Sequence, residues 1–201
     1  MAALTRSSAI DMTAPGLPGP ARRALPSRRR ERAWVRGAQA GSPEAMEALF
    51  RAHWGRAHRA AFLIVHDAAA AEDIAQEAFL AAIRALHRFD RRRPFGPWLH
   101  RIVVNRAIDW SRARSLRREV AESPHSEARP DTPGGWSEEV VAALGALDPD
   151  QRAVVVLRHL LEYTPGEIAA LLAIPRGTVN SRLRRALDRL AVELGPLEER
   201  P

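Results

Sequence analysis

The chain has 201 residues, 46% of them hydrophobic and only 5% aromatic, and a formal net charge of +7. Without cysteine it can form no disulfide, thiolate metal site or cysteine nucleophile, and no apolar run approaches the roughly 20 residues that span a bilayer. Its apolar residues, mainly Ala, Leu and Val, favour helices over strands, and its charge favours an anionic partner, nucleic acid before a membrane.

The first segment is rich in Pro, Gly, Ser and Arg and ends in the run SRRR at 27–30. Such a composition has too few apolar side chains to bury, so we predict a disordered basic tail over 1–31. The segment lacks the apolar core of a signal peptide, and we therefore expect a cytoplasmic protein.

Three helices are predicted next. Apolar residues recur at helical spacing over 33–39, and then over a longer stretch that Ser42 opens and that ends near His66. A third helix is predicted over 69–88. Its core-facing residues are expected to be Phe79, Ile83 and Leu86, which are spaced at i, i+4 and i+7.

A different face of this third helix is acidic and polar. Asp73, Gln76 and Glu77 lie there at i, i+3 and i+4, with Glu72 beside them. Acidic groups near a helix N-terminus gain a few tenths to about 1 kcal/mol from the helix dipole, which is sufficient to explain Glu72 and Asp73. Gln76 gains nothing from the dipole, so the alternative is a docking surface for a basic partner.

A basic stretch follows. Two prolines and a glycine are expected to prevent helix over 89–97, and a fourth helix is predicted over 98–115. Between Arg84 and Arg118 there are eleven arginines and two aspartates, the balance that nucleic-acid binding requires.

The aromatic residues among these arginines allow two interpretations. They can stack on unpaired bases, which is worth about 1–3 kcal/mol per base, or they can belong to the hydrophobic core. We expect Trp98 and Trp110, which are flanked by apolar helix positions, in the core. We expect Phe95, isolated between Pro94 and Gly96, to be exposed.

The pattern changes again after this helix. Residues 116–136 show no helical or strand period and predict a flexible linker. Ser137 then caps a helix. The four residues from Asp148 resemble a capping box, which is expected to open the next helix. We predict a compact four-helix domain over 137–194, followed by a short tail over 195–201.

The stretch 163–190 predicts a helix-turn-helix. Thr164 and Glu167 have capping-box spacing with a proline between them, and Pro175 is expected to end the first helix and open the second at its first position. The inward residues of the second helix are expected to be Val179, Leu183, Ala186, Leu187 and Leu190.

Another face of that second helix is basic. Arg176, Asn180 and Arg184 lie on it at i, i+4 and i+8, flanked by Ser181 and Arg185. Guanidinium and amide groups near a helix start suit base edges and phosphates in the major groove. The alternative is an ordinary solvated basic face, but the capping box and the proline-marked turn favour a DNA-binding helix.

Three segments in this order resemble the extracytoplasmic-function group of sigma-70 family factors, which are initiation subunits of bacterial RNA polymerase. They are AEDIAQEAFLAAIRALHRFD, PFGPWLHRIVVNRAIDWSR and ALDPDQRAVVVLRHLLEYTPGEIAALLAIPRGTVNSRLRRAL. The resemblance implies an all-α chain with two small helical domains joined by a flexible linker. Sigma region 2 is expected over 32–115 and the helix-turn-helix of region 4 over 137–194.

The resemblance also implies three sets of site residues. The set for the clamp helices of core RNA polymerase is Asp73, Gln76 and Glu77. The set for an unstacked base in the non-template strand of the minus-ten element is Phe89, Arg92, Phe95, Arg101 and Asn105. The set for the duplex minus-thirty-five element is Arg176, Thr178, Asn180, Ser181, Arg184 and Arg185.

The implied partners are core RNA polymerase, through the clamp helices and flap of its large subunits, promoter DNA and an anti-sigma factor. No cofactor, metal or membrane insertion is implied. Two departures from the family bear on DNA specificity. Asn180 stands where relatives often have Lys or Arg. The minus-ten loop before Trp98 has proline and arginine where many relatives have a small polar residue and glycine.

Two other classes of function fit the sequence less well. A stand-alone helix-turn-helix regulator does not need the arginine–aromatic loop, because it recognises duplex DNA only. An enzyme is not expected, because the histidines lack HExxH or other metal spacing and no nucleophile motif or phosphate loop is present.

Overall fold

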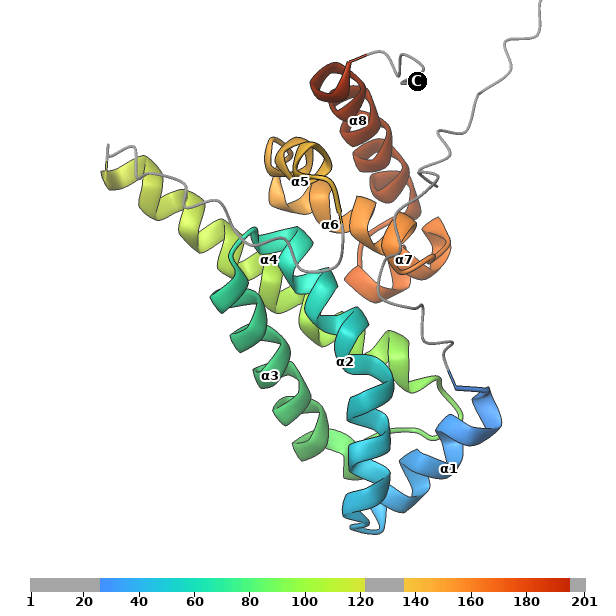
Figure 1. Ribbon diagram of the computed structural model, residues 1–201. Helices are drawn as coiled ribbons and strands as arrows, with labels where there is room; N and C mark the ends of the chain where they lie inside the picture. Colours follow the sequence, from blue (N-terminus) through green and yellow to red (C-terminus); the bar gives the residue numbers. More distant parts are fainter. Residues whose placement is uncertain (1–25, 122–135, 196–201) are drawn as a thin grey trace, which may run out of the picture.

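The computed structural model describes residues 26–121 and 136–195, with residues 118–121 described by their backbone alone. All regular structure in these two ranges is helical, which confirms the predicted all-α class. The helices form an N-terminal unit, residues 28–121, and a C-terminal unit, residues 138–194, that lies against it (Figure 1). None of these helices is long and apolar enough to cross a membrane.

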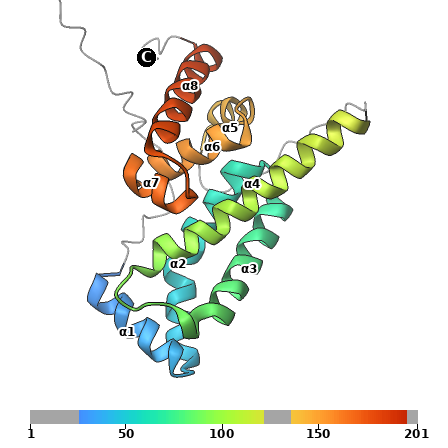
Figure 2. The ribbon, with the colours of Figure 1, turned by 180° about the vertical axis from the view of Figure 1, so that it is seen from behind.

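The N-terminal unit is a bundle in which α2, α3 and α4 pack on one another and α1 lies across α2 (Figures 1 and 2). Its elements are α1 (Arg28–Gln39), α2 (Pro43–Val65), α3 (Ala68–Ala85), the single 3₁₀ turn η1 (Leu86–Arg88) and α4 (Phe95–Ala121).

The C-terminal unit is built around its last helix, which contacts the three α-helices before it. Its elements are α5 (Glu138–Gly145), α6 (Pro149–Val155), the π-helical turn η2 (Val156–Leu160), α7 (Pro165–Leu172) and α8 (Arg176–Leu194).

Side-chain caps set most helix starts. The hydroxyl of Ser42 accepts the N–H of Ala45, and Ser137 caps α5 in the same way, as predicted. Asp148 occupies the N-cap of α6, but its side chain makes no cap hydrogen bond, so the expected capping box does not form there.

The predicted disordered tail extends too far at its C-terminal end. Ser27 is the N-cap of α1 and accepts the N–H of Arg30, so 28–31 form the first turn of that helix. Three arginines are tolerated in this turn because Ser27 accepts one of its free N–H groups and the negative charge of Glu31 is favourable at the positive end of the helix dipole. Residues 1–25 of the predicted tail lie outside the described residues.

Helix α4 is longer than predicted at both ends. Phe95, Gly96 and Pro97 form its first turn. Proline is tolerated there because the first N–H groups of a helix have no partner within it, so the missing N–H costs no hydrogen bond. The loop is therefore confined to 89–94. At the other end, 116–121 continue the helix rather than beginning the linker; the rest of the expected linker, up to residue 135, lies outside the described residues.

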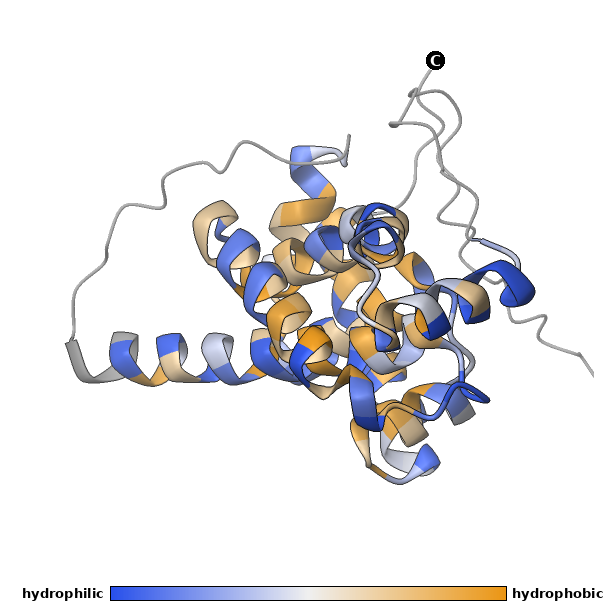
Figure 3. Cartoon of the chain, turned by 90° about the horizontal axis from the view of Figure 1, so that it is seen from below, coloured by the Kyte–Doolittle hydropathy of each residue, from blue (hydrophilic) through white to orange (hydrophobic). Residues whose placement is uncertain are grey.

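The core lies between the helices, while their outer faces are largely hydrophilic (Figure 3). Phe79 and Leu86 are buried as predicted, but Ile83 is 42% exposed, so its assignment to the core is wrong. The physical reason is that Ile83 shares the outer face of α3 with Gln76 and Leu80, at helical spacing. The ring of Phe79 instead packs against Phe50 of α2.

Helix α1 fixes the loop 89–94 from both sides. The side-chain amide of Gln39 donates to the carbonyls of Leu86 and Phe89, both at 2.9 Å. The carboxylate of Glu31 accepts the backbone N–H of Phe95 at 3.2 Å and so caps the start of α4. Its other oxygen lies 3.0 Å from Nε2 of buried His53, an ion-pair distance without hydrogen-bond geometry.

These contacts make Glu31 a stability determinant with a defined pH dependence. Burial raises the pKa of Glu31, but the contact with His53 and the N–H of Phe95 outweigh it, so the folded-state pKa lies below 4.5. A depressed pKa contributes stability that is present above the unfolded-state value and is lost as pH falls through the folded-state value.

Replacing Glu31 by Ala is expected to lower the free energy of unfolding at pH 7 by about 1–3 kcal/mol, because the N–H of Phe95 loses its partner. Urea unfolding at pH 7 and at pH 4 measures this, and the difference between variant and wild type should shrink at the lower pH. Glu47→Ala, which removes only an exposed pair with Arg51, is the control and should change stability by about 0.5 kcal/mol or less.

Candidate nucleic-acid interface

The C-terminal unit contains the predicted helix-turn-helix. The hydroxyl of Thr164 accepts the N–H of Glu167 at 3.3 Å, and the carboxylate of Glu167 accepts the N–H of Thr164 at 2.8 Å, a complete capping box at the start of α7. Ala173 ends α7 in the left-handed conformation, with φ of 55°. Pro175 is the N-cap of α8 rather than its first residue, a shift of one position from the prediction.

Helix α8 divides into an inner and an outer face. Val179, Leu183, Ala186 and Leu190 are buried, and Leu187 is half-buried. The predicted groups that are exposed are Arg176, Asn180, Arg184 and Arg185. Thr178 and Ser181 are half-buried, and the hydroxyl of Ser181 donates to the carbonyl of Thr178 at 3.0 Å. The outer face therefore offers one amide and three guanidinium groups, with these two residues at its edge.

The N-terminal unit carries a second basic surface on α4 and the loop before it. Arg101 and Asn105 are exposed one helical turn apart on the same face of α4. Arg92 is exposed in the loop, and its backbone is held on both sides. Its N–H donates to Asp90 at 2.9 Å, and its carbonyl accepts the side chain of Arg32 at 3.3 Å.

The aromatic residues of this surface are arranged differently from the prediction. Phe95 is only 4% exposed, so its expected exposure is wrong, and Phe89 is 8% exposed. Phe95 is buried because it begins α4, with its N–H on Glu31 and its ring against His53. Neither ring is free to stack on an incoming base in this arrangement.

Trp98 is the ring of this cluster that reaches solvent. It was expected in the core but is half-buried, and its ring centroid lies 4.6 Å from that of Phe89. Its spacing of three from Phe95 is the signal that could have placed it beside the loop. Trp110, also expected in the core, is half-buried under the guanidinium of Arg114, 5.0 Å from the ring centre.

The acidic and polar face of α3 is presented as predicted, with Asp73, Gln76 and Glu77 all exposed. The amide of Gln76 donates to Glu72 at 3.0 Å, and Glu77 pairs with Arg106 of α4 at 2.5 Å. These groups lie on a helix held by the bundle, so their spacing is fixed before any partner arrives.

The outer face of α3 continues toward its C-terminal end as an apolar surface, which the sequence-based prediction missed. Leu80 is 51% exposed and lies one helical turn beyond Gln76, and exposed Ile83 follows it. Phe50 of α2 lies at the edge, with its ring 4.9 Å from that of Phe79. Contiguous exposed apolar side chains on a monomer mark an interaction surface. Among the described residues, no group of three histidine or acidic side chains could hold a metal ion.

Comparisons with known proteins agree with this division of the chain. The family model for Sigma-70 region 2 matches residues 49–117, and that for Sigma-70, region 4 matches residues 137–190. The RNA polymerase sigma factor CarQ of Myxococcus xanthus is 34% identical over 163 residues, 79% of this chain and 94% of CarQ. The ECF RNA polymerase sigma factor SigM of Mycobacterium tuberculosis is 36% identical over 159 residues, 79% of this chain and 81% of SigM.

Two solved structures are similar. CnrH, in complex with the cytosolic domain of CnrY, is 30% identical with a TM-score of 0.63, over 82% of this chain and 97% of CnrH. The sigma factor RpoE of Bartonella quintana, in complex with the anti-sigma factor NepR, has a TM-score of 0.60 over 76% of this chain and 98% of RpoE. At 23% identity, this second likeness is one of fold.

The capping box makes a prediction about the helix-turn-helix. Thr164→Ala removes the acceptor for the N–H of Glu167 and is expected to cost about 1 kcal/mol in the free energy of unfolding, measured by urea denaturation. Glu167→Gln is the matched control, because a glutamine at this position can still reach the N–H of Thr164. A larger loss for the glutamine variant than for the alanine variant would contradict this account.

Proposed function

The chain belongs to the sigma-70 family, in its extracytoplasmic-function group, and on that basis we propose which of its residues carry out the work of a promoter-specificity subunit. Such a factor binds core RNA polymerase, recognises the minus-thirty-five and minus-ten elements and promotes strand opening. The observation that carries the residue assignment is the presence of two separate basic surfaces, one on each helical unit.

The polymerase-binding surface is proposed to be the outer face of α3. Asp73, Gln76 and Glu77 would contact the basic and polar groups of a polymerase helix in the clamp. Leu80 and Ile83 extend this contact with apolar area, which supplies affinity where the charged groups supply orientation. The ion pair between Glu77 and Arg106 is exposed, so its exchange for a partner's cation costs little.

The minus-ten element is proposed to bind α4 and its preceding loop. Arg92, Arg101 and Asn105 are exposed and would contact the phosphates and bases of the non-template strand. Buried Phe89 and Phe95 would hold the loop in shape, and Trp98 would offer the accessible aromatic surface. Stacking of about 1–3 kcal/mol per base offsets the few kcal/mol that unstacking a base costs. Strand opening then needs binding energy alone, and no covalent chemistry is assigned to the chain.

The minus-thirty-five element is proposed to lie against the outer face of α8. Arg176 is at the start of the helix, where phosphates are favoured by the dipole as well as by the guanidinium. Asn180, Arg184 and Arg185 follow along the exposed face. An asparagine at 180 suits an adenine edge, whereas the arginines suit guanine or phosphate.

An anti-sigma factor is a proposed partner, because the similar sigma factor of Bartonella quintana was solved in complex with one. We place the chain in the cytoplasm, where it would meet core polymerase. The alternative of a stand-alone regulator is not favoured, because the models for regions 2 and 4 both match the chain in that order.

The polymerase surface can be tested by charge reversal. Asp73→Arg combined with Glu77→Arg is expected to abolish promoter-dependent run-off transcription with core RNA polymerase, because two attractive contacts become repulsive. The control, Glu47→Arg with Glu193→Arg, makes the same charge change at exposed sites on α2 and α8, outside the proposed contact residues, and should retain activity. Undiminished transcription by the α3 variant would contradict the assignment of polymerase binding to α3.

The minus-thirty-five surface can be tested by alanine substitution on α8. Arg184→Ala is expected to weaken binding of the polymerase complex to promoter duplex by about 1–3 kcal/mol if the guanidinium contacts a base, and to lower the salt dependence if it contacts a phosphate. Filter binding or fluorescence anisotropy at two salt concentrations measures both. Arg189→Ala, exposed but beyond the recognition turns, should have little effect.

A further inference from the structure

One arc of α1 carries four exposed arginines. Because a helix turns by about 100° per residue, residues 28, 32 and 36 follow one another around it in steps of about 40°, and residue 29 lies next to 36. The guanidinium of Arg30 lies elsewhere, 5.5 Å from the ring centre of Trp34, on the side of α1 that faces α2. The exposed arc, named the α1 stripe, consists of Arg28, Arg29, Arg32 and Arg36.

The α1 stripe is continuous with the loop before α4. This loop runs beside α1 (Figures 1 and 2), and the guanidinium of Arg32 donates to the carbonyl of Arg92 at 3.3 Å. The loop adds three exposed arginines of its own, at 91–93. Two segments that are 60 residues apart in the chain thus form one basic surface.

Little negative charge offsets this surface. Helix α1 and the loop contain one acidic residue each, Glu31 and Asp90. Glu31 is buried, 3.0 Å from His53, and accepts the N–H of Phe95. Asp90 is exposed and accepts the N–H of Arg92. In these two segments, the four guanidinium groups of the stripe and the three of the loop therefore accompany one exposed carboxylate.

The stability of α1 does not explain the stripe. Arg28 and Arg29 stand in the first turn, where the positive end of the helix dipole disfavours cations. Arg32 lies beside the arginines of the loop, and groups of like charge repel one another. An anion bound along the stripe would relieve both effects, so the arrangement favours an anionic ligand.

The line of charges fits the backbone of a nucleic-acid strand. Between Arg28 and Arg36, α1 rises about 12 Å, the length of about three to four nucleotides at 3.4 Å each. A strand supplies a phosphate at every nucleotide along that line, whereas a protein partner has no such regular charge. The residues proposed for the minus-ten strand include Arg92, so a strand held by the loop can continue onto α1.

The order of elements gives the direction of this strand. The end of α4 leads along the chain to the unit proposed to bind the minus-thirty-five element, which lies upstream of the minus-ten element. Asn105, Arg101 and the loop then follow one another toward the start of α4, and α1 lies beside the loop. A strand that follows them from the upstream side therefore reaches α1 with the nucleotides just downstream of the minus-ten element.

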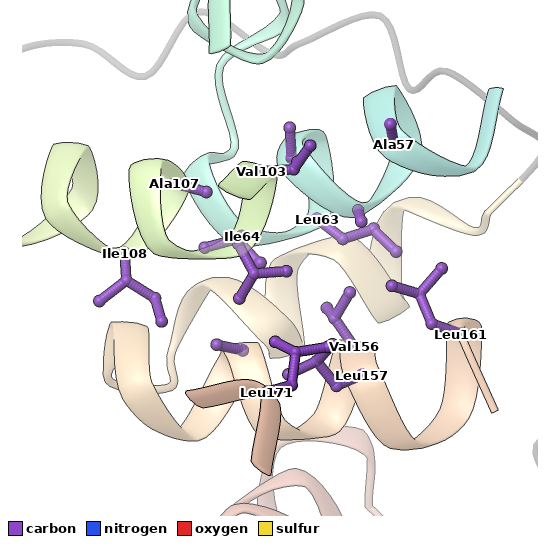
Figure 4. Close-up of a cluster of buried hydrophobic side chains, with 14 of the residues drawn as sticks. Ala57, Leu63, Ile64, Val103, Ala107, Ile108, Val156, Leu157, Leu161 and Leu171 are labelled. Atoms are coloured by element: carbon purple, nitrogen blue, oxygen red, sulfur yellow. The ribbon is translucent and has the colours of Figure 1, made fainter. Parts of the chain in front are cut away.

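The C-terminal unit leaves the stripe exposed. It packs on apolar side chains of α2 and α4, as Figure 4 shows, and the hydroxyl of Tyr163 is hydrogen-bonded to Nδ1 of His100 in α4 at 2.7 Å. All four arginines of the stripe are exposed in this arrangement. A ligand can therefore reach the stripe in the free chain.

We propose that the α1 stripe binds the phosphates of the non-template strand just downstream of the minus-ten element, so that the melted strand crosses from the loop onto α1. This inference rests on the proposed function and adds a contact outside the residues proposed for the minus-ten element. Contacts to phosphates position a strand and carry no sequence information of their own. The stripe would therefore hold the melted strand whatever its sequence.

Single-strand binding by the full chain tests the stripe. Arg28→Gln with Arg36→Gln removes two guanidinium groups and keeps Arg32, which also holds the loop. The probe is a fluorescein-labelled oligothymidylate, and fluorescence anisotropy over a range of salt concentrations gives the affinity. We expect about tenfold weaker binding at ~0.1 M salt and a slope of log K against log salt that is less steep by about 1.4, because each phosphate contact contributes about 0.7.

The matched control is Arg30→Gln with Arg51→Gln. It removes the same charge from the groove between α1 and α2, on the other side of α1, and should leave the affinity and the salt slope near those of the wild type. Equal losses in the two pairs, or no loss in the stripe pair, overturn the proposal. If circular dichroism shows that the stripe pair loses helix, Arg36→Gln alone decides, with an expected change in slope of about 0.7.

The position of the strand is tested in the complex with core RNA polymerase. Because the chain has no cysteine, Ala33→Cys, exposed on α1, can carry a single photo-crosslinker. On a promoter that the factor transcribes, we expect crosslinks to non-template nucleotides just downstream of the minus-ten element. The same label at Ala69→Cys, exposed on α3, should give none there. No crosslink from α1 to those nucleotides overturns the proposal.

The stripe and the proposed function can fail separately. If the wild type gives no promoter-dependent transcription with core polymerase, the proposed function fails, while the salt slopes of the free chain still decide whether the stripe binds a strand. If transcription is normal but the stripe pair binds the strand as tightly as the control pair, the stripe alone is overturned. A hexaglutamate peptide that binds the wild type and not the stripe pair, with strand binding unchanged, would assign this surface to an acidic protein partner instead.

Discussion

A single helix, α4, has three faces with different roles: one packs in the bundle, one meets the C-terminal unit and one is exposed. Leu99 and Val103 are buried within the N-terminal bundle, and Ile108 is turned toward α6 of the other unit. The remaining arc is left to Arg101 and Asn105, which are exposed. Because a helix turns once in 3.6 residues, these faces are fixed relative to one another. A change in how the bundle packs would therefore also move the basic surface and the face that meets the C-terminal unit.

The start of α4 shows why this helix is held so firmly. Its first N–H belongs to Phe95 and is accepted by Glu31 of α1, while Gln39 of the same helix holds the carbonyls on the other side of the loop. A loop held by a neighbouring helix loses little conformational entropy when it binds a strand. The first helix thus supports the proposed nucleic-acid surface, although none of the predicted contact residues lies on it.

Local rules were sufficient to predict much of this molecule. Ser42, Ser137 and Thr164 cap helices as their positions indicate, and the capping box and proline identify the helix-turn-helix. Prediction failed where a distant partner decides the outcome. Nothing near Phe95 in the chain indicates that Glu31, 64 residues earlier, will accept its N–H, or that its ring will lie against His53. Ile83 fits a core stripe by spacing alone, and only the packing of the bundle shows that it faces outward.

The π-helical turn η2 has a consequence for the geometry of the whole chain. A π turn holds one residue more than an α turn, and here the N–H of Leu161 reaches back to the carbonyl of Val156. If the same residues formed ordinary α turns instead, everything after them would be rotated by about 100°. Tyr163 would then leave His100, and the helix-turn-helix would turn another side toward α4. The π geometry of this one turn therefore sets which side of α8 and of the helix-turn-helix lies toward α4.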